Sequence, residues 1–180
     1  MESPLPLSEC PVENIVFDPR IKKTITSSRR IISYDVIPLK YKSPVSNLTQ
    51  ELIFQGVEME SERGIRTYLR NGYLKYEMRS EPFNNRGFIR KWTNVCYDGI
   101  NNFGSGARLT PIIDIKLVYP PIIGSVFTDL ENKQIPWILL TGAYIRFIPI
   151  LRVRQILIYP NGLPCLRMEI VSATVTHISR

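Results

Sequence analysis

The C-terminal half of the chain is a nearly continuous apolar stretch that prolines interrupt, and this feature limits the possible folds most. Residues after Leu109 are mostly aliphatic, aromatic or β-branched almost to the end of the chain, a composition typical of β-strands. The chain holds 14 prolines in 180 residues, and a proline inside a helix removes a hydrogen bond and clashes with the preceding turn. The sequence therefore predicts a strand-rich protein with little room for long helices.

Apolar runs bounded by turn residues predict the individual strands. We expect strands at residues 31–41, 87–97, 112–119, 122–128, 137–147, 151–159 and 166–177. Pro38 indicates an edge or a bulge, because proline cannot donate to a strand ladder. Pro160-Asn161-Gly162 is typical of a turn, so the strands on either side of it should pair in an antiparallel manner.

Residues 65–78 fit two patterns. The apolar side chains of Ile65, Tyr68, Leu69, Tyr73 and Tyr76 have helical spacing. Asn71-Gly72, in contrast, is a strong signal for a two-residue β-hairpin turn, which would place Leu69 opposite Leu74 and Arg66 opposite Glu77. We favour the hairpin because it gives one apolar face, one charged face and a cross-strand pair of opposite charge.

A short helix is expected across residues 44–59. Ser43 can cap it, Pro44 suits its first position, and Val45, Leu48 and Leu52 give a rough apolar face. Residues 98–106 have the composition of a loop.

These elements predict the fold class and the domain organisation. We expect an α+β, strand-dominated protein: an antiparallel β-sheet or a partly open barrel with one or two short helices. Residues 20–180 should form a single basic domain. Residues 1–19, with four prolines and four acids, are expected to form an irregular acidic arm.

Positive charge is concentrated before Trp92. The chain has a formal net charge of +7, and residues 62–91 hold eight basic and three acidic side chains, 8 − 3 = +5. The predicted anion-binding residues are Arg29, Arg30, Arg63, Arg66, Arg70, Lys75, Arg79, Arg86, Arg90 and Lys91, with Tyr68, Tyr73 and Trp92 as aromatic contacts. Cations beside aromatic rings suit RNA, where rings stack on bases, and also an anionic membrane surface. A solvated basic face with aromatic residues in the core is the third interpretation.

The residues needed for catalysis or metal binding are sparse. The chain has one histidine, His177, and three widely spaced cysteines, Cys10, Cys96 and Cys165. A Cys165–His177 dyad would need two residues twelve positions apart to meet. We therefore predict a protein that is not an enzyme, with no catalytic residue, metal site or cofactor.

Self-association is expected at two places. Residues 135–151 form the most apolar segment, which is either a buried strand or an exposed subunit interface containing Trp137. The N-terminal residues Pro4, Leu5, Pro6 and Leu7 could contact a neighbouring copy.

The profile as a whole resembles the matrix proteins of plant rhabdoviruses, especially the cytoplasmic group. The similarity comprises a small basic chain, no secretory signal at Met1–Pro6, the arm Ser3-Pro4-Leu5-Pro6, and a strand at 31–42 followed by Ser43-Pro44 and a helix candidate. The resemblance implies a non-enzymatic virion protein of the host cytoplasm, peripheral to the membrane. It implies that the protein self-associates, binds the viral nucleoprotein–RNA complex or RNA directly, and contacts an anionic membrane. A capsid or movement-type β-barrel protein that binds single-stranded RNA is the alternative.

Overall fold

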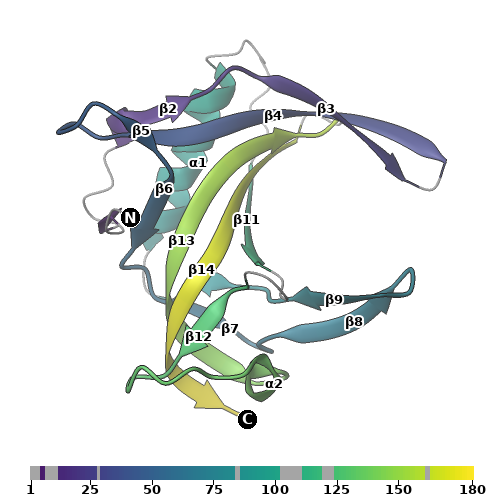
Figure 1. Ribbon diagram of the computed structural model, residues 1–180, viewed down its shortest axis with the longest axis vertical. Helices are drawn as coiled ribbons and strands as arrows, with labels where there is room; N and C mark the ends of the chain where they lie inside the picture. Colours follow the sequence, from purple (N-terminus) through teal and green to yellow (C-terminus); the bar gives the residue numbers. More distant parts are fainter. Residues whose placement is uncertain are drawn as a thin grey trace.

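The computed structural model describes residues 5–6, 12–27, 29–83, 86–101, 111–118, 124–160 and 163–180 (Figure 1). In chain order the elements are β1 (Leu5–Pro6), the 3-10 helix η2 (Val12–Asn14), β2 (Ile15–Phe17), β3 (Ile21–Ser27), β4 (Arg30–Lys42), β5 (Thr49–Gln50), β6 (Leu52–Gln55), β7 (Met59–Ser61), β8 (Arg66–Arg70), β9 (Tyr73–Glu77), β10 (Glu81–Pro82), α1 (Arg86–Asn101), β11 (Ile112–Leu117), β12 (Val126–Thr128), α2 (Trp137–Leu140), β13 (Tyr144–Ile158) and β14 (Pro164–Ser179). The strand-dominated α+β class is confirmed. Among the described residues the sheet stays open and does not close on itself.

Two long strands, β13 and β14, form the centre of the sheet. They pair antiparallel from Tyr144 opposite Ser179 to Ile158 opposite Pro164, which confirms the predicted pairing. Register shifts interrupt the ladder at three places along β13. Such irregularities bend a strand and increase its twist, and the two strands curve together through the molecule in Figure 1.

The outer edge of β13 is divided among three strands. β7, β6 and β4 pair in turn with residues 145–147, 151–153 and 155–158 of β13. Pro149, which has no N–H to donate, lies between the parts that pair with β7 and β6. Pro38 has a similar place on β4, between the residues that pair with β3 and those that pair with β2. Each proline thus lies where a strand changes partner.

β14 carries two shorter strands on its other edge. β11 and β12 both pair with it in the parallel orientation, over residues 165–170 and 172–174 respectively. Parallel neighbours need long crossover connections, and the chain between α1 and β13 supplies both strands. The strand predictions at 31–41 and 166–177 are confirmed by β4 and β14. The strand predicted at 112–119 is confirmed over Ile112–Leu117 by β11, and residue 119 lies outside the described residues.

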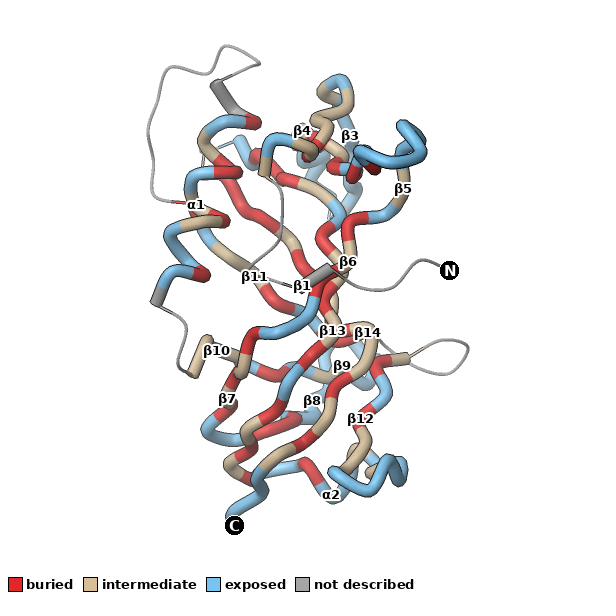
Figure 2. Tube along the Cα trace, turned by 90° about the vertical axis from the view of Figure 1, so that its left-hand side faces the viewer, coloured by how far each residue is buried: buried red, intermediate tan, exposed pale blue. Residues whose placement is uncertain are grey.

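The core lies between one face of the sheet and α1 (Figure 2), and α1 corrects the strand predicted at 87–97. Phe88, Trp92, Val95 and Cys96 are buried, and their spacing of four, three and one is helical. Trp92 stacks on Phe54 of β6 with ring centroids 5.0 Å apart. The β-branched and aromatic residues of this segment suit a strand locally, but the helical spacing brings the four buried side chains onto one face against the sheet.

The helix predicted at 44–59 is wrong, because the segment forms a turn and the strands β5, β6 and β7. The Ser43 hydroxyl accepts hydrogen bonds from the backbone of Val45 and Ser46, so it caps a turn and not a helix. Asn47 then adopts a positive φ of 61°, which ends any helical path. Leu52 and Phe54 are both fully buried, which is the alternation of a strand.

Four further segments differ from the sequence predictions. The segment predicted as one strand at 137–147 begins as α2 and joins β13 only from Tyr144. The separate strand at 151–159 is the continuation of β13. Of the strand predicted at 122–128, β12 covers only Val126–Thr128; residues 124–125 are not in a strand, and residues 122–123 lie outside the described residues. The loop predicted at 98–106 is helical through residue 101, and residues 102–106 lie outside the described residues.

Part of the segment predicted as an irregular arm belongs to the sheet. β1 pairs in parallel with Phe54–Gln55 of β6, and β2 pairs with β4. The Ile15 side chain is buried in the core, and Asp18 forms a 3.1 Å ion pair with Lys40. Residues 1–4 and 7–11 lie outside the described residues.

Replacing Trp92 by alanine tests how much the contact between α1 and β6 stabilises the fold. Trp92 is fully buried, so Trp92→Ala should lower the free energy of unfolding by about 3–5 kcal/mol. Leu130 is 75% exposed, and Leu130→Ala should change it by less than about 0.5 kcal/mol. Urea denaturation followed by circular dichroism measures both; equal effects would contradict this account of the core.

Alanine substitutions at Gly64 and at Gly142 give a second comparison of two variants. Both glycines have positive φ, 58° and 71°, but a Cβ on Gly64 would overlap the Leu140 carbonyl, whereas one on Gly142 would meet no atom within 4 Å. Gly142→Ala should cost about 1–2 kcal/mol of left-handed strain. Gly64→Ala should cost more, because the backbone of α2 must also move. Equal shifts in the urea midpoint would show that this close approach is not tight.

Candidate anion-binding surface

The first cationic element is the hairpin formed by β3 and the first half of β4. Its strands pair from Ile21 opposite Val36 to Ser27 opposite Arg30. Between residues 19 and 34 the sequence has no acid. The side chains of Lys22, Lys23, Arg29 and Arg30 are exposed. This hairpin therefore presents positive charge with no negative charge along its outer part.

The second cationic element is the β8–β9 hairpin, whose predicted register is confirmed. Leu69 lies opposite Leu74 and Arg66 opposite Glu77. Asn71 and Gly72 have φ values of 52° and 78°, as a two-residue hairpin turn of the favoured hand requires. The helical alternative for residues 65–78 is therefore wrong.

The two faces of the β8–β9 hairpin differ in chemistry. Arg66, Tyr68, Arg70, Tyr73 and Lys75 share one face with the acid Glu77, because directly opposite residues point the same way. All six are exposed. On the other face Leu69 and Leu74 are 75% and 52% exposed, so the face predicted to be apolar extends into solvent.

Both hairpins project from the same side of the sheet, whereas α1 lies toward the other side (Figure 1). We call the seven exposed basic side chains that they carry the hairpin cations: Lys22, Lys23, Arg29, Arg30, Arg66, Arg70 and Lys75. None of them has an ion-pair partner among the described residues. Lys22 and Lys23 were not among the predicted site residues; the acid-free stretch around them is the signal that could have identified them.

Cations within the central sheet, in contrast, have nearby carboxylates. Glu169 of β14 contacts the guanidinium groups of Arg152 and Arg154, each at 3.1 Å. Asp114 and Lys116 of β11 form a 3.3 Å ion pair. Between the central sheet and the hairpins, the hairpins therefore carry the positive charge that no ion pair balances.

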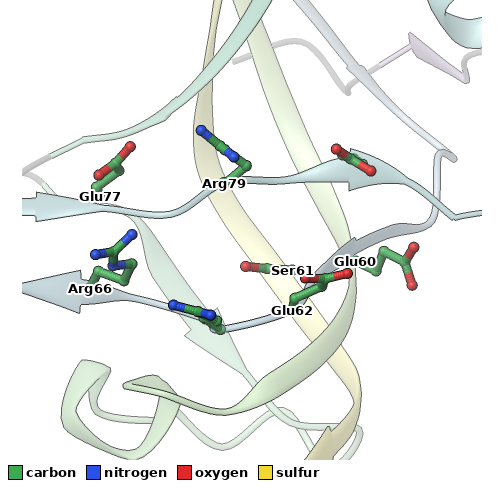
Figure 3. A pocket seen from close by; sticks show the side chains of 9 residues that line it. Glu60, Ser61, Glu62, Arg66, Glu77 and Arg79 are labelled. Atoms are coloured by element: carbon green, nitrogen blue, oxygen red, sulfur yellow. The ribbon is translucent and has the colours of Figure 1, made fainter.

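A charged cleft of about 420 Å³ lies at the base of β8 and β9 (Figure 3). Its charged lining consists of Glu60, Glu62, Glu77, Glu81, Arg63, Arg66 and Arg79, which sum to 3 − 4 = −1. The Tyr144 hydroxyl donates a 2.6 Å hydrogen bond to Glu60. Arg63, Arg66 and Arg79 of the predicted site therefore share this cleft with four acids, and the cleft is a poorer anion site than the outer parts of the hairpins.

The predicted cations on α1 are separate from the hairpins. Arg90 is exposed and Lys91 is half-buried, and both lie on the helix that covers the core. Arg86 begins the same helix. These residues are close to the hairpin residues in the sequence, but they lie on a different element of the fold.

Trp92 is corrected as an aromatic contact, because its side chain is fully buried. Tyr68 and Tyr73, the other two predicted contacts, are 42% and 71% exposed. Of the three predicted aromatic contacts, these two rings can therefore reach a partner from the surface.

The predicted self-association residues do not form one surface among the described residues. Leu5 and Pro6 form β1 against the chain's own β6, and Pro4 and Leu7 lie outside the described residues. Trp137 is half-buried, with its indole N–H donating to the Ser125 carbonyl at 2.9 Å and its ring 5.2 Å from that of Tyr76. Leu130, Ile138 and Leu139, in and before α2, are the exposed apolar side chains of that region.

The residues considered for catalysis lie far apart. Cys165 is opposite Leu157 near one end of β14, and His177 is opposite Arg146 near the other. Twelve strand residues span roughly 40 Å. Among the described residues no three His, Cys, Asp or Glu side chains are grouped so that they could hold a metal ion. No helix in the described part of the chain is long and apolar enough to cross a membrane.

Cysteine labelling should confirm that the thiols are inert. Burial raises the pKa of Cys96 to about 12 and also raises that of Cys165, so the thiolate fraction of Cys96 near neutral pH is on the order of 10⁻⁵. In a Cys10→Ser background, neither thiol should react with Ellman's reagent until denaturant is added. Rapid labelling of the native protein would contradict this burial.

Comparison of the chain with protein-family models, with curated protein sequences and with solved structures finds no match. The resemblance to plant rhabdovirus matrix proteins therefore stays a prediction. The distribution of charge and apolar side chains on the two hairpins is the basis for assigning a function.

Proposed function

We propose that this chain is a non-enzymatic, matrix-type viral assembly protein that bridges a ribonucleoprotein to an anionic membrane. The observation that carries the proposal is the concentration of the seven hairpin cations on one side of the molecule, without ion-pair partners among the described residues. Unpaired surface cations attract phosphate groups of RNA and of acidic lipids alike.

A bridging protein needs more than one place of attachment, and the two hairpins supply two. They have different sequences, and β3–β4 is part of the large sheet whereas β8–β9 forms a separate two-stranded sheet, so each can contact a partner of its own. In this proposal the protein resides in the virion and the host cytoplasm, at the periphery of the membrane. Copies associate with each other through exposed apolar residues such as Leu130, Ile138 and Leu139.

The cationic face of β8–β9 supports the contact with RNA or the nucleoprotein–RNA complex. Tyr68 and Tyr73 alternate there with Arg66, Arg70 and Lys75. Exposed rings between cations can stack on unpaired bases while the cations contact phosphates. A capsid or movement-type RNA-binding barrel could use the same chemistry, but the open sheet does not favour that alternative.

Neutralising one hairpin tests the RNA contact. Each phosphate contact on a single strand adds roughly −0.7 to the slope of log K against log salt, so Arg66→Gln, Arg70→Gln and Lys75→Gln together should lower the size of that slope by about 2. The matched control replaces three exposed cations elsewhere, Lys42, Arg90 and Lys133, by glutamine. It removes the same charge and should keep the wild-type slope.

Fluorescence anisotropy with a labelled single-stranded RNA over a range of salt concentrations gives these slopes, and circular dichroism checks folding. Equal slopes for both triple variants would mean that net charge, and not the hairpin, determines binding.

Vesicle flotation tests the membrane half of the proposal. Wild-type protein that floats equally with neutral and acidic lipid would refute that half.

A further inference from the structure

One face of the β3–β4 hairpin is apolar over much of its length. Strand pairing places Ile21 opposite Val36, Lys23 opposite Tyr34, and Ile25 opposite Ile32. Opposite residues share a face, and this face alternates along each strand with a mostly polar one that carries Lys22, Thr24, Thr26, Ser33 and Asp35, with Ile31 near its outer end. Ile21, Ile25 and Ile32 are 47%, 47% and 40% exposed, so the isoleucines of this face remain partly in contact with water.

The apolar face continues onto the sheet beside it. Val36 packs with Leu157 and Cys165 in a small cluster against which Tyr34 rests. The Tyr34 and Tyr159 rings lie 6.0 Å apart in a tilted arrangement. The isoleucine stripe thus ends at a pair of tyrosines. Tyrosines are enriched where an apolar phase meets water.

Cations surround this stripe. Lys23 and Arg30 share its face, and Lys22 and Arg29 lie on the same hairpin. Arg20, at the base, is held by Asp35 through a 2.8 Å hydrogen bond. The occupant of the face must therefore accept both aliphatic side chains and positive charge.

Charge decides between the possible occupants. A second copy bound through the same face would bring four cations of each copy together, which like-charge repulsion opposes. Single-stranded RNA would meet aliphatic side chains between Ile21 and Ser33, because the only described rings of this face, Tyr34 and Tyr159, lie together at one end of the stripe and do not alternate with the cations as stacking rings do. Of these three occupants, an anionic lipid surface is the one that meets both requirements, because it has acyl chains for the isoleucines and acidic headgroups for the lysines and arginines.

We propose that the face of Ile21, Ile25, Ile32 and Tyr34 is the membrane-contacting surface of the protein, lying flat at the boundary between headgroups and acyl chains. The inference rests on the proposed membrane role and assigns it to one hairpin and to one face of that hairpin. The isoleucines enter the acyl boundary, Tyr34 and Tyr159 lie at the headgroup level, and Lys23 and Arg30 contact acidic lipid.

Vesicle binding by two matched double variants tests which hairpin is involved. Ile25→Ser with Ile32→Ser removes an exposed cross-strand pair from β3–β4, and Leu69→Ser with Leu74→Ser removes the equivalent pair from β8–β9. With vesicles of 70% phosphatidylcholine and 30% phosphatidylserine, the isoleucine variant should bind at least about tenfold more weakly than wild type. The leucine variant should bind like wild type, and both should keep wild-type RNA binding.

A tryptophan reporter tests which face is involved. Ile32→Trp places an indole on the apolar face, and Thr24→Trp places one on the opposite face of the same hairpin. On acidic vesicles that contain brominated lipid, fluorescence quenching should increase at position 32 and remain unchanged at position 24. The fluorescence of Trp92 and Trp137 in the wild-type protein supplies the background.

The outcomes separate the two proposals. If wild type requires acidic lipid but the isoleucine variant binds equally well, or if position 24 is quenched like position 32, this assignment fails while the membrane role stands. Wild type that ignores lipid charge would overturn both. Loss of RNA binding in the isoleucine variant, with vesicle binding retained, would reassign this face to the ribonucleoprotein.

Discussion

The antiparallel ladder between β13 and β14 is the interaction on which the rest of the structure depends. Nearly every other strand of the sheet reaches its place by pairing with one of these two, directly or through β4. The outer edge of β13 receives β7, β6 and β4 in turn, and that of β14 receives β11 and β12. The helix α1 covers one face of this sheet, and the two cationic hairpins extend beyond the sheet on the other side (Figure 1).

The distribution of charge follows from the same arrangement. Strands within the sheet bring acids and bases from distant parts of the chain together, as Glu169 does for Arg152 and Arg154. A hairpin that extends beyond the sheet has fewer strands beside it that could supply acids. In β3–β4 the outer part has no acid, and in β8–β9 the only acid is Glu77. Much of the net positive charge of the chain is thus concentrated on the side of the molecule from which the hairpins project.

Local signals were sufficient for some elements and not for others. The Asn71-Gly72 turn and the alternation beside it determine a hairpin register without any distant contact, and that register was predictable. The helix α1 was missed because its residues suit strands almost equally well, and packing of Trp92 on Phe54 decides between them. The helix expected at 44–59 does not form, because strand pairing with β13 buries Leu52 and Phe54. Here a distant contact favours a strand where the local sequence suggests a helix. For the site, the sequence identified cations by type, but only the fold shows that those of α1 lie apart from those of the hairpins.

The outer ends of both hairpins are two-stranded ribbons with large apolar side chains in solvent, among them Ile31 at 74% and Leu69 at 75% exposure. Isolated ribbons of this kind are only marginally stable in water, so their tips open locally at low free-energy cost. Part of the free energy of contact is then spent on ordering, which makes the attachment of one molecule weak and short-lived. Durable coating of a surface would arise from avidity: many copies held side by side, each able to detach and rebind without releasing the layer.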